Sequence, residues 1–118
     1  MKVIALLVTA LSLLLPGAAN AQILNELAAS PISRFSAADN KLLLSAIDKA
    51  LADKADGAAL AWKSDTSPAR GSVTPRRTFE SDGAQCRDLL IANEYRSRNA
   101  QSVHTFCRDS AGAWKLRS

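Results

Sequence analysis

The sequence contains only one histidine and two cysteines, and this scarcity limits the chemistry that the chain can perform. A nucleophile-histidine-acid triad would have to be built on His104, which falls inside an expected strand. A zinc site would need more imidazole or thiolate ligands than the chain offers. The sequence also lacks a CxxC pair for redox exchange and a glycine-rich loop for phosphate binding. We therefore expect no catalytic residues, no metal site and no cofactor.

The sequence also lacks an apolar run long enough to cross a membrane. The run from Val3 to Leu15 has 13 residues, and at about 1.5 Å per helical residue it falls short of a hydrocarbon core about 30 Å thick. Lys2 precedes this run and Ala19-Asn20-Ala21 follows it, which is the order of a secretory signal. We expect residues 1–21 to be a signal peptide that is cleaved after Ala21, which leaves no transmembrane segment and no cysteine near the new terminus for a lipid anchor.

The remaining sequence is long enough for one small domain. Residues 22–35 include a short helix-compatible stretch that Pro31 interrupts, and we interpret them as a loosely held N-terminal leader. Residues 36–118 are expected to form a single α+β domain, in which one amphipathic helix packs on a small antiparallel sheet of about four strands.

The helix is expected from Ala37 to about Asp56. Ser36 and Asp39 form a capping-box-like start, and Gly57 is well placed to end the helix because it tolerates a positive φ. An apolar stripe at helical spacing runs along one side of this segment and consists of Leu43, Ile47, Ala50 and Leu51.

Strands and turns are expected after residue 57. The pattern predicts a strand at 58–63, a loop at 64–71, a strand in the later part of 73–81 because Pro75 disfavours the earlier part, and a turn at 81–83. A last strand is expected at 113–116.

The two cysteines predict the register of a hairpin. If Cys86 lies directly opposite Cys107, paired positions sum to 193 and the turn falls at residues 96 and 97, where the sequence is most polar. One face of this hairpin would then carry Leu90 and Val103 with the cysteines, and the other Leu89, Ile91, Tyr95 and Phe106. Both faces have apolar content, so the face that meets the helix stays open. We expect a structural cross-strand disulfide, worth roughly 3 kcal/mol for a loop of about 20 residues.

The positive charge is concentrated in the second half of the chain. Residues 58–118 carry ten basic and six acidic side chains, whereas residues 22–57 carry four and five. In an exported protein this favours attraction to anionic envelope material rather than to nucleic acid. A merely solubilising basic surface is the alternative.

Several blocks in this half resemble one known family. They are Trp62, residues 71–79, Asp82-Gly83, Cys86-Arg87, Cys107-Arg108 and residues 112–115. In order and spacing they are similar to the C-terminal domain of the 17 kDa outer-membrane surface antigen family, over about residues 58–118. The resemblance implies an envelope protein without a known catalytic activity or a defined ligand. Typical members have a lipobox cysteine and many have a glycine zipper, which this sequence lacks, so we expect a free or peripherally attached form.

The expected protein is thus a non-enzymatic component of the bacterial cell envelope, located in the periplasm or peripherally on the outer membrane. Its partners would be anionic envelope lipids or another envelope protein, and the candidate anion-binding residues are Arg76, Arg77, Arg87 and Arg108. The oligomeric state stays open. The alternative is a secreted inhibitor of a lytic hydrolase such as lysozyme, because small disulfide-bonded sheet domains also serve that purpose.

Overall fold

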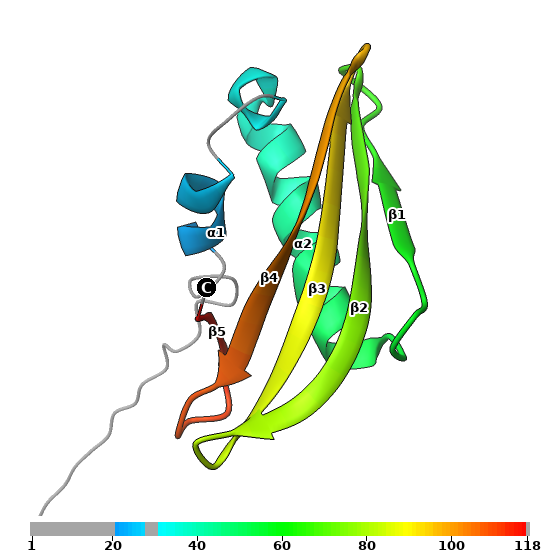
Figure 1. Cartoon of the computed structure of the whole chain (residues 1–118). Coiled ribbons are helices and arrows are strands. Elements are labelled where there is room, and N and C mark those ends of the chain that lie inside the picture. The colour runs from blue at the N-terminus through cyan, green and yellow to red at the C-terminus, as the bar shows by residue number, and fades with distance from the viewer. Residues whose placement is uncertain (1–20, 28–30, 118) are drawn as a thin grey trace, which may run out of the picture.

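The computed structural model describes residues 21–27 and 31–117. They form one antiparallel sheet with helices on one side of it (Figure 1). The elements in chain order are α1 (Ala21–Glu26), the 3-10 helix η1 (Ile32–Arg34), α2 (Ala37–Asp53), β1 (Leu60–Lys63), β2 (Ala69–Ser81), β3 (Ala84–Tyr95), β4 (Arg98–Arg108) and β5 (Trp114–Leu116). The expected signal peptide lies outside the described residues, apart from Ala21.

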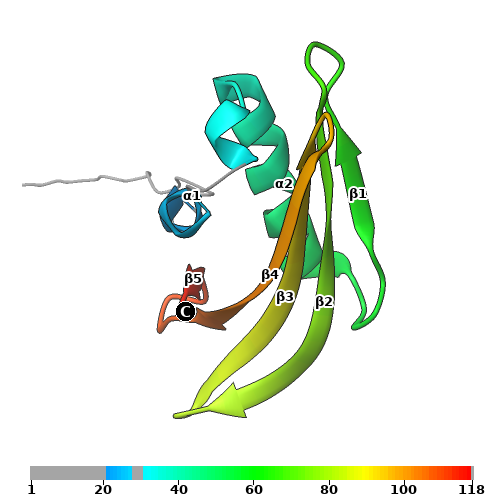
Figure 2. The same cartoon turned by 45° about the horizontal axis from the view of Figure 1, so that its top comes forward.

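The sheet is a five-stranded meander, with strand order β1-β2-β3-β4-β5 and every neighbouring pair antiparallel. The α+β class with one main helix is therefore confirmed, although the sheet has five strands where about four were expected. Figure 2 shows α1 and α2 on the same side of the sheet, and no described helix covers the other face. Within the described ranges, no helix is both long enough and apolar enough to span a bilayer.

The predicted hairpin register is confirmed along the whole β3–β4 pair. Cys86 lies opposite Cys107 and Tyr95 opposite Arg98, so paired positions sum to 193 throughout. The chain reverses at Arg96 and Ser97, and Arg96 adopts a φ of 59° there. Period-two alternation and a direct cross-strand pair were together sufficient to set this register.

The open question of which sheet face meets the helix is resolved by burial. Leu89, Ile91 and Phe106 are 0%, 1% and 0% exposed, and they lie in one core with α2 residues such as Leu43 and Ile47. We call this side the helix face and the opposite side the helix-free face. The disulfide, Leu90 and Val103 lie on the helix-free face, because their side chains alternate with the buried set.

Helix α2 begins as predicted and ends earlier than predicted. Ser36 Oγ accepts the N–H of Asp39 at 3.1 Å, and the Asp39 carboxylate accepts the N–H of Ser36 at 3.0 Å, which completes the capping box. The helix ends at Asp53 rather than near Asp56, because Lys54 is already extended. Gly57 has a φ of 89°, and its N–H donates to Pro75 O at 2.7 Å.

Strand β2 is longer than the sequence predicted, since it begins at Ala69 and contains Pro75. The register with β3 shifts between Pro75 and Arg77. Strand β1 pairs with β2 only as far as Val73, so the missing N–H of Pro75 faces no strand on that side. Proline is tolerated at such an edge and bulge position.

The expectation of a loosely held N-terminal leader is wrong for the described part of residues 22–35. Ile23 is 0% exposed and Ile32 is 7% exposed, and both belong to the main core. Phe35 makes an edge-on ring contact with Trp62, with centroids 5.5 Å apart. The segment is therefore packed on the helix face.

Candidate functional site

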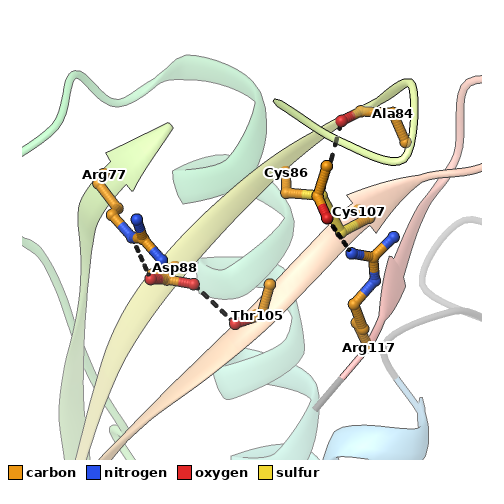
Figure 3. Close-up of a disulfide and its surroundings, with 8 residues drawn as sticks. Arg77, Ala84, Cys86, Asp88, Thr105, Cys107 and Arg117 are labelled. Carbon is orange, nitrogen blue, oxygen red and sulfur yellow. Dashed lines mark hydrogen bonds and ion pairs between the residues drawn. A yellow bond between two sulfur atoms is a disulfide. The ribbon is translucent and has the colours of Figure 1, made fainter. Parts of the chain in front are cut away.

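The predicted disulfide is present at one end of the helix-free face. Cys86 and Cys107 are bonded to each other and almost fully buried. Figure 3 shows them beside a polar chain that crosses three strands. In this chain Arg77 Nε donates to Asp88 Oδ2 at 2.7 Å, and Thr105 Oγ1 donates to Asp88 Oδ1 at 2.7 Å. Covalent and charge-assisted bonds therefore tie β2, β3 and β4 together at this end.

Arg87, a candidate anion-binding residue, is buried in the helix face and binds the C-terminal end of α2. Its Nη1 donates to Ala50 O at 3.0 Å and to Leu51 O at 2.9 Å. Its Nη2 donates to Lys54 O at 2.7 Å and to Asp56 Oδ1 at 2.8 Å.

The last guanidinium hydrogen of Arg87 is also used, because Nε donates to Thr78 Oγ1 at 2.9 Å. A guanidinium has five N–H donors, so none is left for an external anion. The positive charge also lies at the negative end of the helix dipole, where it is stabilising. The structure therefore gives Arg87 an architectural contact in place of the expected anion contact.

The other three candidate arginines are exposed, and the fold does not gather them with Arg87 into one site. Arg77 is held by Asp88 and lies over the ring of Phe79, with its Cζ 4.1 Å from the centroid. Arg76 lies at the register shift beside it. Arg108 lies over Trp114 near β5, with its Cζ 4.8 Å from the ring centroid.

Two carboxylates help to fix α2 to the sheet: Asp39 lies in the helix, and Asp56 follows its C-terminal end. Asp39 is fully buried and accepts a hydrogen bond from Ser67 Oγ at 2.8 Å, which joins the helix N-terminus to the β1–β2 loop. Burial raises the pKa of Asp39, but the hydrogen bonds from Ser36 and Ser67 outweigh this and hold it below its usual value. The hydrogen bond from Arg87 lowers the pKa of Asp56.

His104 lies on the helix face and is 8% exposed. Its Nε2 lies 2.7 Å from Ser102 Oγ. Burial lowers its pKa, and the carboxylate of Glu26 opposes this. His104 lies in β4, so the expectation that it falls inside a strand is confirmed.

A hollow of about 490 Å³ lies at the other end of the sheet, near the β3–β4 turn, and no pattern in the sequence indicated it. It is lined by three consecutive rows that run across the sheet, and each row has one residue from each of β1, β2, β3 and β4. One row consists of Ala61, Ser72, Ala92 and Gln101, on the helix-free face. Three of these four side chains are small, so they form a low floor. We call this hollow the trough.

A row of longer polar side chains stands on one side of the floor. It consists of Lys63, Arg70, Glu94 and Asn99. Arg70 donates to Glu94 through Nε at 3.2 Å and through Nη2 at 3.4 Å. Sequence reasoning missed this surface because only the β1–β2 and β2–β3 registers bring these residues into rows.

The third row lies between these two rows and consists of Trp62, Gly71, Asn93 and Ala100. A Cβ on Gly71 would clash with the carbonyl oxygen of Ala92 and would lie 2.8 Å from Trp62 Nε1 and 3.0 Å from Asn93 Oδ1. Glycine therefore permits the close approach of both side chains to the strand. Trp62 Nε1 and Asn93 Oδ1 are buried, and neither has a hydrogen-bond partner among the described residues.

Comparisons with known proteins agree with the resemblance found in the sequence. A family model described as 17 kDa outer membrane surface antigen matches residues 49–115, so the match begins within α2 and covers more than half of the chain. No curated protein and no solved structure matches the chain. The matched region contains Arg87, the disulfide and the trough. The chain therefore belongs to the 17 kDa outer membrane surface antigen family, which indicates a protein of the cell envelope.

Proposed function

We propose that the protein is an exported, non-enzymatic binding module of the cell envelope that uses the helix-free face of its sheet. The observation that carries this proposal is the one-sided packing of the sheet. The helix-free face has an exposed Val103, 49% accessible, and the trough. Large pockets with a few convergent polar groups are the default location of a binding site.

The arrangement of titratable groups supports a binding role over a catalytic one. Among the described residues that line the trough, the only carboxylate is that of Glu94, which is paired with Arg70. The histidine lies on the opposite face, and an acid–base mechanism needs such groups within hydrogen-bond reach of one reacting atom. We therefore infer that the protein recognises a partner without changing it.

Basic side chains on the same face support association with anionic envelope material. Arg76 and Arg77 are both exposed, and Arg77 is paired with Asp88 on that face. Burial raises the pKa of Asp88, but the hydrogen bonds from Arg77 and Thr105 and the positive charges of Arg77 and Arg76 hold it below its usual value, so Arg76 also lies near this carboxylate. Attraction between exposed charges is screened by salt, with a Debye length of about 8 Å at physiological ionic strength. Association through these residues should weaken as salt is added.

Co-sedimentation of the purified protein with isolated envelope fragments, at low and at high salt, tests this proposal. The double variant Arg76→Gln/Arg77→Gln should bind several-fold more weakly at low salt. Lys41→Gln, which removes one exposed charge from α2 on the opposite side, should bind like the wild type. Binding that is insensitive to salt and to both variants would contradict the proposal, and near-stoichiometric suppression of a lytic activity would favour the inhibitor alternative.

A further inference from the structure

The trough has the form of a site for an elongated ligand. Its floor crosses four strands, and three strand spacings of about 4.8 Å give it a length of about 14 Å. Its volume of about 490 Å³ lies within the range of about 300–1,000 Å³ that is typical of small-molecule sites. The small side chains of Ala61, Ser72 and Ala92 make the depression, because the neighbouring row carries long side chains.

The polar groups of the trough favour a ligand that is rich in hydroxyl groups. Ser72, Asn99 and Gln101 can each donate and accept hydrogen bonds. A hydroxyl group has the same double capacity, so a saccharide can use all three. Ala61 and Ala92 in the floor offer a small aliphatic surface for the C–H faces of sugar rings. A purely apolar ligand would leave these polar groups without partners, which is costly.

The charges of the trough favour a ligand that carries a carboxylate. Glu94 occupies Arg70 through two hydrogen bonds and repels multiply charged anions. Lys63 is exposed, and no carboxylate of the described residues lies within ion-pair distance of it. The three charged groups therefore sum to one positive charge, which one carboxylate complements.

We propose that the trough binds an oligosaccharide that carries a carboxylate. Its hydroxyl groups would hydrogen-bond to Ser72, Asn99 and Gln101, and its carboxylate would face Lys63. This inference rests on the proposed use of the helix-free face for binding and names the class of partner. Two chemical sources share these features, a uronic acid chain and an amino-sugar chain whose sugars bear a lactyl carboxylate.

Titration of the disulfide-bonded protein, followed by amide chemical shifts in ¹H–¹⁵N spectra, tests the proposal. The probes are a short oligouronate and a short lactyl-bearing amino-sugar oligomer, each compared with its carboxyl-reduced neutral counterpart, and inorganic phosphate. At least one carboxylated probe should shift amides in the three rows of the trough, and it should bind more tightly than its neutral form. The probe that binds identifies the source. If neither shifts these amides, or if phosphate shifts them equally, the proposal is wrong.

Matched variants assign the binding to the trough. Ala92→Leu fills the floor and should weaken binding at least tenfold, whereas Ala111→Leu adds the same bulk at an exposed position in the turn before β5, outside the trough, and should have no effect. Lys63→Gln should abolish the preference for the carboxylated probe, and Lys41→Gln should preserve it. The spectra also report whether each variant is folded.

The outcomes separate this inference from the proposed function. If the wild type associates with envelope fragments but Ala92→Leu binds the saccharide as the wild type does, the trough assignment is wrong and the proposed function stands. If the trough binds the saccharide but the protein does not associate with envelope fragments, the proposed function is wrong and the assignment of the trough stands.

Discussion

Replacement of Arg87 by methionine should destabilise the fold more than the loss of any exposed arginine. Methionine keeps an unbranched apolar stem but removes all five donors that hold Ala50, Leu51, Lys54, Asp56 and Thr78. The carbonyl oxygens of α2 stay in place and lose their charged partner. The effect should therefore be loss of stability without loss of the antiparallel register.

The magnitude follows from which acceptors are left unsatisfied. Ala50 O keeps the N–H of Lys54 at 3.3 Å, so the largest costs come from the carbonyls of Leu51 and Lys54. An unsatisfied buried acceptor costs about 1–3 kcal/mol, so the two carbonyls together cost about 2–6 kcal/mol. Removal of a buried charge returns part of this energy. Small domains have about 5–15 kcal/mol of stability, so the loss is a substantial fraction.

Urea unfolding followed by far-UV circular dichroism measures this effect. Arg108→Met is the matched control, because it removes the same charge from an exposed side chain whose ring contact with Trp114 is worth about 0.5–1 kcal/mol. Arg87→Lys, which retains the charge but has three donors, should fall between the two. If Arg87→Met is as stable as Arg108→Met, the architectural contact assigned to Arg87 is wrong.

Three further predictions concern other contacts. Gly71→Ala should cost about 1–3 kcal/mol in urea unfolding, because its Cβ would meet Ala92 O and Trp62 Nε1; Ser72→Ala is the control, and equal stability would refute the close approach. The double variant Cys86→Ser/Cys107→Ser should have a free energy of unfolding about 3 kcal/mol lower than the wild type. If the wild type unfolds at the same temperature with and without reductant, this prediction is wrong. Burial lowers the pKa of His104 in the folded state. The neutral side chain should therefore stabilise the fold above the unfolded-state pKa of about 6.5, and this stabilisation should be lost as the pH falls through the folded-state pKa. His104→Gln should remove that part of the pH dependence, and an unchanged pH profile of the free energy of unfolding would refute it.

The hairpin and the helix start could be predicted because their determinants are local or periodic. Ser36 and Asp39 are three residues apart, so the capping box needs no tertiary contact. Cys86 and Cys107 fix the register of two strands because side chains alternate with period two. Pro75 made the predicted strand β2 too short. A proline is tolerated within this strand because β1 pairs with β2 only as far as Val73.

The contacts of the candidate anion-binding arginines could not be predicted from the sequence, because an arginine next to a cysteine has no fixed structural role. Arg87 and Arg108 follow the two cysteines in the same way. The fold buries Arg87 under α2 and leaves Arg108 exposed beside Trp114. Only the position of α2 distinguishes the two residues.

The fold class, the disulfide, the hairpin register and the family could all be predicted from the sequence. These features depend on short-range spacing, on side-chain periodicity and on the order of residue blocks. The tertiary structure decided which sheet face is buried, what Arg87 binds and where the trough lies. Arg87 and Ala50 are 37 positions apart, and the trough needs four strands in register. Such contacts arise only when the sheet and the helix pack together, because neither element alone specifies which distant groups become its neighbours.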